Sequence, residues 1–301
     1  MEETTYNNVV GKGAHLRVGT FFRQSFIPLP LIPLFLFISV FFFWPLASVF
    51  THSFQSNEGN FTFDNIKTLF QDPYKLAFTN SISIGLVSAA IGAVFGAITS
   101  YAIEVRGSDK LKKFISSISG VLANTGGVPL AFMFLAAFGP QGLITRLINL
   151  LGFDLYGNGF TLFSFTGLVI IYAYFQIPIM VIVFTPALSA LRKEWREASA
   201  NLGANPLAYW RHVGIPILLP SFISSFLLLF ASGFSAFATA RAMTVGNIAL
   251  VPLQIGVLLD GNITVNQLNL GYALALGMIV ISVLAMAPYL FIQTRTSRWQ
   301  Q

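Results

Sequence analysis

Charged residues are scarce in this chain, and cysteine is absent from it. Lys, Arg, Asp and Glu make up only 9% of the 301 residues, against about a quarter in a soluble globular domain. A chain with so few charges and 55% hydrophobic residues could not cover its own surface in water. The lack of cysteine excludes disulfides and thiolate metal sites. These shortages predict a membrane protein rather than a large soluble helical core.

Several catalytic motifs are missing as well. The three histidines, His15, His52 and His212, lie outside the long apolar runs, so an intramembrane serine enzyme would lack its activating base. The sequence has no His-Glu-x-x-His motif and no Gly-x4-Gly-Lys-Ser/Thr phosphate-binding loop. We therefore expect no catalytic residue, no metal site and no cofactor. Any ATP hydrolysis that this protein depends on must therefore occur on a separate polypeptide.

Six apolar runs are each long enough to cross a bilayer. None contains Asp, Glu, Lys, Arg or His, and lipid allows such a run to satisfy its backbone hydrogen bonds only as a helix. The first run follows basic residues, as a signal peptide does, but it is long for one and lacks a clear cleavage site, so we expect a retained anchor. The predicted fold class is all-α, a polytopic membrane protein whose six spans are 31–50, 81–103, 115–138, 163–188, 217–240 and 268–292.

Lys and Arg gather in alternate loops, which is typical of the cytoplasmic side. The N-terminal tail, the loops after the second and fourth runs, and the C-terminal tail hold 13 of the 17 basic residues. Both termini are thus expected in the cytoplasm, as tails 1–25 and 296–301 around a transmembrane region 26–295. The net charge of +6 reflects topology, so the expected partner is the lipid bilayer and not nucleic acid.

The second run is rich in small residues at four-residue spacing. Small residues let helix backbones approach closely in lipid. A tightly packed helix beside a pore and ordinary helix packing both explain the two rows, which are Gly85, Ala89, Ala93 and Ala97, and Gly92, Gly96 and Ser100.

The loop at 188–216, after the fourth run, has a helix–turn–helix pattern. Gly203 stands where a helix commonly ends in a left-handed turn, Asn205 then caps a second helix, and Pro206 begins it. This helix–turn–helix unit, called the elbow below, lies either on lipid headgroups or against a partner. Apolar residues at spacings of 3 and 4 predict one amphipathic helix before Gly203, with a stripe of Leu188, Leu191, Trp195, Ala198 and Leu202.

Part of this loop resembles the EAA loop of the permease subunits of binding-protein-dependent ABC importers. The family pattern is Glu-Ala-Ala, three residues, Gly, nine residues, and Ile-x-Leu-Pro. Ser199, Val213 and Ile215 are mild replacements within it. The likeness extends over roughly residues 25–295 and is carried by Glu197-Ala198-Ser199, Gly203 and Val213-Gly214-Ile215-Pro216.

The resemblance implies a type I ABC importer permease fold in a bacterial inner membrane. It implies partners of three kinds: a cytoplasmic ABC ATPase dimer, a second permease that we expect to differ from this chain, and an extracytoplasmic substrate-binding protein. The sequence resembles permeases for polyamines, which implies a small polar solute such as a polyamine as the substrate, with 2-aminoethylphosphonate or ferric iron as alternatives. The implied ATPase-coupling residues are Glu197, Ala198, Ser199, Gly203, Val213 and Pro216.

Polar residues inside spans are costly and commonly face a cavity or a neighbouring helix. No span carries a charge, which disfavours a secondary transporter or channel coupled through a membrane acidic residue. Specificity would then lie largely with the external binding protein. Pore lining and interhelical hydrogen bonding are both open for the candidate residues Asn124, Thr125, Tyr172, Gln176, Ser232, Ser235 and Thr239.

Overall fold

The computed structural model of the protein describes residues 31–157, 159–244, 247–260 and 267–296. Every named element in these ranges is helical, and an isolated β-bridge joins Gln55 to Phe61. Six helical segments there are long and apolar enough to cross a membrane, so the predicted all-α class with six spans is confirmed. The expected tail 1–25, and all but residue 296 of the tail 296–301, lie outside the described residues.

The chain divides into two compact units, residues 1–49 and 50–301. The described part of the first unit is one apolar helical segment, built from α2 (Ile32–Ile38), the π-helical turn η2 (Ser39–Phe43) and most of α3 (Trp44–Ser53). This segment is the first of the six candidate spans.

Both π-helical turns, η2 and η3 (Trp210–Gly214), end two residues before a proline. In each, the residue before the proline donates its N–H five residues back, from Trp44 to the Ser39 carbonyl and from Ile215 to the Trp210 carbonyl. A proline has no N–H, and its ring clashes with the carbonyl four residues earlier. A wider turn relieves that clash and keeps the helix continuous.

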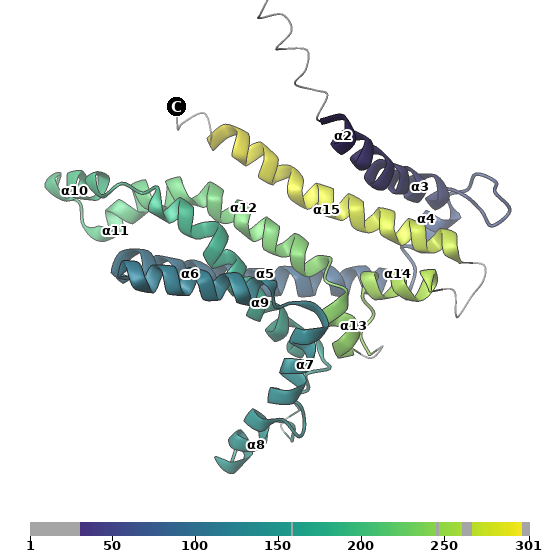
Figure 1. Ribbon diagram of the computed structural model, residues 1–301, viewed down its shortest axis with the longest axis horizontal. Coiled ribbons are helices and arrows are strands. Elements are labelled where there is room, and N and C mark those ends of the chain that lie inside the picture. Colours follow the sequence, from purple (N-terminus) through teal and green to yellow (C-terminus); the bar gives the residue numbers. More distant parts are fainter. Residues whose placement is uncertain (1–30, 158, 245–246, 261–266, 297–301) are drawn as a thin grey trace, which may run out of the picture. The chain divides into compact units, whose positions relative to one another are not determined.

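Four long helices form the bundle of the larger unit. α5 (Tyr74–Arg106) packs along α9 (Phe165–Ser189) and α12 (Ile215–Phe234). α12 also packs along α15 (Leu268–Thr296), and the four helices lie side by side in Figure 1. α9, which has 25 residues and is apolar on all sides, is the most buried candidate span.

The small residues of α5 bring its neighbours close. A Cβ added at Gly96 would lie 2.4 Å from Met180 Cβ of α9, and one at Gly92 would lie 2.7 Å from Gln176 Cβ. A Cβ at Gly85 would lie 3.2 Å from the Phe230 ring of α12. Both rows predicted from the sequence therefore serve close helix packing.

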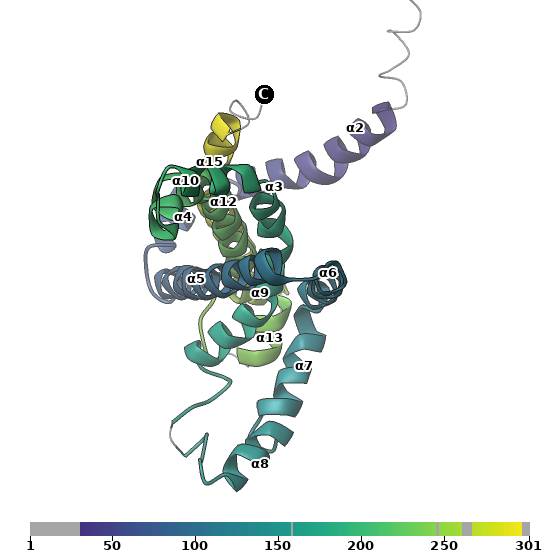
Figure 2. The same ribbon diagram turned by 90° about the vertical axis from the view of Figure 1, so that its left-hand side faces the viewer.

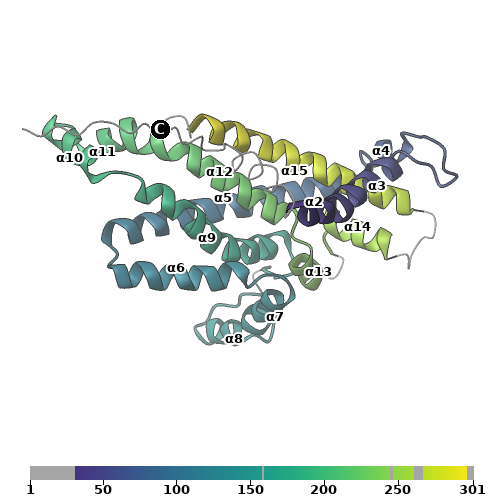
Figure 3. The same cartoon turned by 45° about the horizontal axis from the view of Figure 1, so that its top comes forward.

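Shorter helices surround the two ends of the bundle. α6 packs against α9, and α7 packs against α13, while α7 and α8 lead away from the bundle (Figure 2). α10 and α11 lie at one end of the bundle and α14 lies at the other (Figure 3). The bounds are α4 (Asp64–Thr68), α6 (Asp109–Asn124), α7 (Gly127–Phe138), α8 (Leu143–Leu150), α10 (Lys193–Asn201), α11 (Pro206–Tyr209), α13 (Ala238–Thr244) and α14 (Val251–Leu259).

Two predicted spans are wrong in their bounds. The run 115–138 is not one helix, because the chain breaks between α6 and α7 and the candidate span there is Gly127–Leu150. The run 217–240 is also interrupted, since α12 ends at Phe234 and α13 is separate. At the first break Gly126 is extended and Gly127 has φ +73°. Hydropathy does not register such backbone turns.

Candidate functional site

The elbow, residues 190–216, leaves one end of the bundle after α9. α10 ends at Asn201, and Gly203 follows with φ +80°. Its N–H donates to the Ala200 carbonyl at 2.9 Å, and the N–H of Ala204 donates to the Ser199 carbonyl at 3.0 Å. This pair of bonds is a Schellman motif, which needs a residue in the left-handed region. The glycine predicted to turn the elbow is confirmed in that conformation.

The second arm of the elbow begins as the sequence predicts. The Asn205 side chain accepts from the N–H of Ala208 at 2.7 Å, and Pro206 occupies the first turn of α11. The arm is then held against the bundle by Trp210, whose ring meets that of Tyr101 edge-on at 5.3 Å. Only a glycine fits at 214, because a Cβ there would lie 2.5 Å from the Trp210 ring. The arm is thus anchored to the end of α5.

The predicted apolar stripe of the elbow is wrong at its start. Leu188 is buried within α9, and Leu191 lies in the turn between α9 and α10. The free end of the elbow instead exposes two large apolar side chains, Leu202 at 88% and Leu207 at 75%. Exposed apolar side chains on either side of a fixed glycine turn suit contact with another protein.

The proposed coupling residues lie on both arms. Glu197 and Ala198 are exposed on α10, whereas Ser199 is half-buried. Val213 is half-buried in η3, and Pro216 is exposed at the start of α12. The accessible part of the motif is therefore the first arm and its turn, while the second arm joins the elbow to a bundle helix.

The two helix breaks meet at the other end of the bundle. The Thr239 hydroxyl of α13 accepts from the N–H of Gly127 at 2.9 Å and lies 3.2 Å from the Gly127 carbonyl. Gly127 is the first residue of α7, so its N–H has no partner within its own helix. The two discontinuous segments are therefore joined by one side chain from far along the chain.

Polar side chains around the breaks bond back to the last turn of their own helices. The Asn124 amide donates to the Gly120 carbonyl at 2.8 Å, and the Thr125 hydroxyl donates to the Val121 carbonyl at 2.7 Å. The Ser235 hydroxyl donates to the Ala231 carbonyl at 2.8 Å. Asn124 and Ser235 are exposed, and Thr125 and Ser232 are half-buried, so these four remain accessible from the surface of the chain.

Two pore candidates lie deep between helices. The Tyr172 hydroxyl donates to the Ala236 carbonyl at 3.0 Å, just past the end of α12. Gln176 is fully buried where α5, α9 and α12 meet, and its Nε2 donates to the Leu229 carbonyl at 3.2 Å. Its Oε1 has no hydrogen-bond partner. In this conformation Tyr172, Gln176 and Thr239 are buried and their side chains bond to backbone groups of other segments.

We expect Thr239→Val to destabilise the junction between the helix breaks. The isosteric change leaves the Gly127 N–H without its partner, which costs roughly 1–3 kcal/mol when the group is buried. The control is Thr244→Val, because the buried Thr244 hydroxyl donates only to the Ala240 carbonyl of its own helix. Thermal unfolding of the purified chain in detergent is the measurement. Equal shifts for the two variants would contradict a special role for Thr239.

Sequence reasoning missed three features of these sites. Neither the contact of Trp210 with Tyr101 nor the bond from Gly127 to Thr239 joins residues that are near in the chain. A polar cavity beside α4 also carried no local signal, because two distant segments form it. Within the described part of the chain, no group of three or more His, Asp or Glu residues could hold a metal ion.

Comparison with known proteins gives matches over most of the chain. The family model described as "Binding-protein-dependent transport system inner membrane component" matches residues 92–298. The "Spermidine/putrescine transport system permease protein PotC homolog" of Mycoplasma pneumoniae is 24% identical over 271 residues, 85% of this chain and 87% of that protein. The "sn-glycerol-3-phosphate transport system permease protein UgpA" of Escherichia coli is 28% identical over 245 residues, 75% of this chain and 79% of that protein.

The fold is shared with solved structures of ABC transporters. A chain of a bacterial ABC transporter involved in the import of the acidic polysaccharide alginate aligns with a TM-score of 0.68. The alignment covers 93% of this chain and 98% of that chain at 15% sequence identity. At that identity the match supports the fold alone.

Proposed function

Because the chain belongs to the family of inner membrane components of binding-protein-dependent transport systems, we propose that it forms half of the solute pore of an ATP-driven importer. The observation that carries this proposal is the elbow, an exposed helix–glycine–helix unit anchored to a bundle helix. An expressed, tagged chain should co-purify with a cytoplasmic ATPase and a second permease. Recovery of the chain alone from a strain that makes all components would overturn the proposal.

The elbow is the proposed ATPase contact. Glu197 supplies a charge, Ala198 and Ser199 keep the first arm small, and Gly203 gives the sharp turn between the arms. Closure of two ATPase subunits would then push on the exposed first arm. Val213 and Pro216 pass this movement into α12, because η3 and α12 form a continuous helical path.

The proposed pore lies beside the two helix breaks. Asn124, Thr125, Ser232 and Ser235 are accessible there and uncharged, so they suit a polar solute that passes without tight ionic binding. Tyr172, Gln176 and Thr239 hold the surrounding helices in this conformation, and movement of α12 against α9 would be needed to expose them. Specificity then rests mainly on an extracytoplasmic binding protein.

The elbow must face the cytoplasm for this proposal. A chain without cysteine permits a direct test, because a single introduced thiol has no background. Leu202→Cys at the elbow should react with a membrane-impermeant maleimide only after cells are permeabilised. Phe61→Cys, in the loop between α3 and α4 and 72% exposed, should react in intact cells. The reverse pattern would exclude ATPase coupling through the elbow.

We further propose a polyamine as the imported solute. The similarity to a spermidine/putrescine permease homolog over 85% of the chain supports this choice. Other related permeases are named for sn-glycerol-3-phosphate or molybdenum transport. The alternative solutes for this chain are 2-aminoethylphosphonate and ferric iron. Calorimetry on the binding protein encoded beside this chain is the test. Binding of sugars or peptides alone would end the polyamine proposal.

A further inference from the structure

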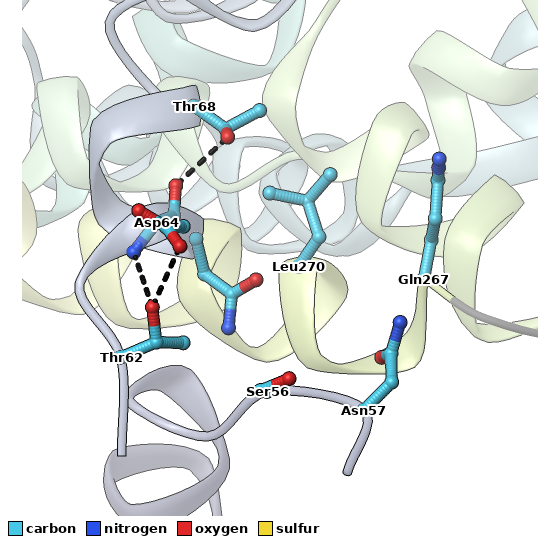
Figure 4. A pocket seen from close by; sticks show the side chains of 8 residues that line it. Ser56, Asn57, Thr62, Asp64, Thr68, Gln267 and Leu270 are labelled. Carbon is cyan, nitrogen blue, oxygen red and sulfur yellow. Dashed lines mark hydrogen bonds between the residues drawn. The ribbon is translucent and has the colours of Figure 1, made fainter. Parts of the chain in front are cut away.

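A polar cavity of about 410 Å³ lies beside α4 (Figure 4). α4 is at the end of the bundle opposite the elbow (Figure 3). The loop between α3 and α4, α4 itself and the start of α15 form its walls. Apart from Leu270, every lining residue is polar, and the lining includes the Asp64 carboxylate. The volume is within the range of small-molecule sites.

Two asparagines hold the loop that forms one wall. The Asn65 amide of α4 donates to the carbonyls of Ser53 and Gln55, at 3.2 and 2.8 Å. The Asn269 amide of α15 donates to the carbonyls of Gln55 and Ser56, at 3.0 and 3.2 Å. Because four bonds from two helices fix the end of α3 and the start of the loop, this wall of the cavity is preformed.

Several donors of the cavity are already used by hydrogen bonds within the protein. The Thr62 hydroxyl donates to Asp64 Oδ2 at 2.9 Å, and the Thr68 hydroxyl donates to the Asp64 carbonyl at 2.8 Å. Both N–H groups of the Asn65 amide are used by the loop. The Asp64 carboxylate and Asn65 Oδ1 remain as acceptors, and the Asn57 and Gln267 amides carry both donors and acceptors. Because Asp64 is the one charged residue of the lining, a ligand that fits this set brings positive charge and N–H donors to its carboxylate.

We propose that this cavity binds a primary ammonium group of a short aliphatic amine. An ammonium carries three donors and no acceptor, which complements the acceptors that remain. Asp64 supplies the counter-charge, Asn65 Oδ1 accepts a second bond, and the aliphatic part lies against Leu270. The Thr62 hydroxyl, followed by the charge of Lys67, lowers the pKa of Asp64, so its carboxylate is ionised at neutral pH.

Lys67 competes for the same carboxylate. Its Nζ lies 3.5 Å from Asp64 Oδ1, and the two side chains are 73% and 78% exposed. Exposed pairs of this kind contribute little to stability. An incoming ammonium therefore replaces Lys67 without a large energetic loss.

The test measures binding of 1,4-diaminobutane to the full-length chain in phosphatidylcholine nanodiscs by calorimetry. We expect Asp64→Asn to weaken binding about tenfold, as loss of a charged hydrogen bond predicts. Lys67→Gln should strengthen binding, because the competing cation is removed. Glu58→Gln is the matched control. It also removes one negative charge, but Glu58 is an exposed residue of the loop before α4 and does not line the cavity.

Two further probes, one without charge and one without N–H donors, complete the design. 1,4-Butanediol lacks the charge, and tetramethylammonium lacks N–H donors, so neither should bind measurably. Equal loss in Glu58→Gln and Asp64→Asn, or binding of either probe as tight as that of the diamine, would overturn the proposal. Amine binding at equilibrium requires neither ATP nor a binding protein, so its failure is distinguishable from failure of the pore function.

Discussion

Gly203→Asp is expected to lower ATP-driven transport at least about tenfold while the chain remains folded in the membrane. Gly203 has φ +80°, where an L side chain costs roughly 1–2 kcal/mol. The new carboxylate would also stand at the C-terminal end of α10, where a negative charge costs about 0.3–1 kcal/mol. No atom lies within 4 Å of the added Cβ. The substitution therefore acts through backbone strain and charge rather than through a steric clash. Relief of that strain changes the angle between the two arms of the elbow.

The chain offers a closely matched control at Gly152. Gly152 follows the end of α8 with φ +84°, and a Cβ added there would also meet no atom within 4 Å. It forms the same Schellman pair, with N–H bonds from Gly152 to Asn149 and from Phe153 to Ile148. Gly152→Asp thus introduces the same strain and charge outside the elbow.

Transport and ATP hydrolysis in proteoliposomes that contain the assembled complex distinguish these variants. A penalty near 2 kcal/mol shifts a conformational equilibrium more than about tenfold, so we expect transport to fall by at least that factor in Gly203→Asp. Gly203→Asn, which tolerates the left-handed region better, should retain part of the activity. Full transport by Gly203→Asp, or an equal loss in Gly152→Asp, would show that the turn does not couple the two subunits.

The parts of the elbow that the sequence predicted correctly are those with local causes. A glycine after the last helical turn, an Asn cap and a Pro at the first position each act within a few residues. The predicted stripe was wrong at Leu188 and Leu191 because the helical period continues through the end of α9. Periodicity alone does not say where one helix stops and the next begins.

One error had a local signal. Hydropathy predicted one helix at 115–138, although the adjacent Gly126 and Gly127 indicate a break. The other features depend on contacts between residues that are far apart in the sequence. Thr239 was chosen as a polar residue in a span, but its partner, the Gly127 N–H, is 112 residues away. The cavity at Asp64 likewise depends on Asn65 and Asn269, which are distant in sequence and hold one loop together.

Gly96→Val is expected to disrupt the packing of α5 against α9. A Cβ at this position would lie 2.4 Å from Met180 Cβ and 2.8 Å from the Ile177 carbonyl oxygen. Neither atom is the mobile end of a side chain, so the two helices must separate. Overpacking of this kind typically costs about 1–3 kcal/mol, and the γ-methyl groups of Val add to the overlap. We expect a loss of stability at the upper end of that range.

Gly120→Val separates this clash from the change in helix propensity. Gly120 lies inside α6, and a Cβ there would meet no atom within 4 Å. The two substitutions replace the same residue with the same side chain in a helix interior, so only the close contact differs. Thermal unfolding in detergent, followed by size-exclusion chromatography of the full chain, should show a much lower midpoint for Gly96→Val than for Gly120→Val. Equal midpoints would mean that the small residues of α5 are not needed for the approach of α9, and that the bundle is held together mainly by its larger side chains.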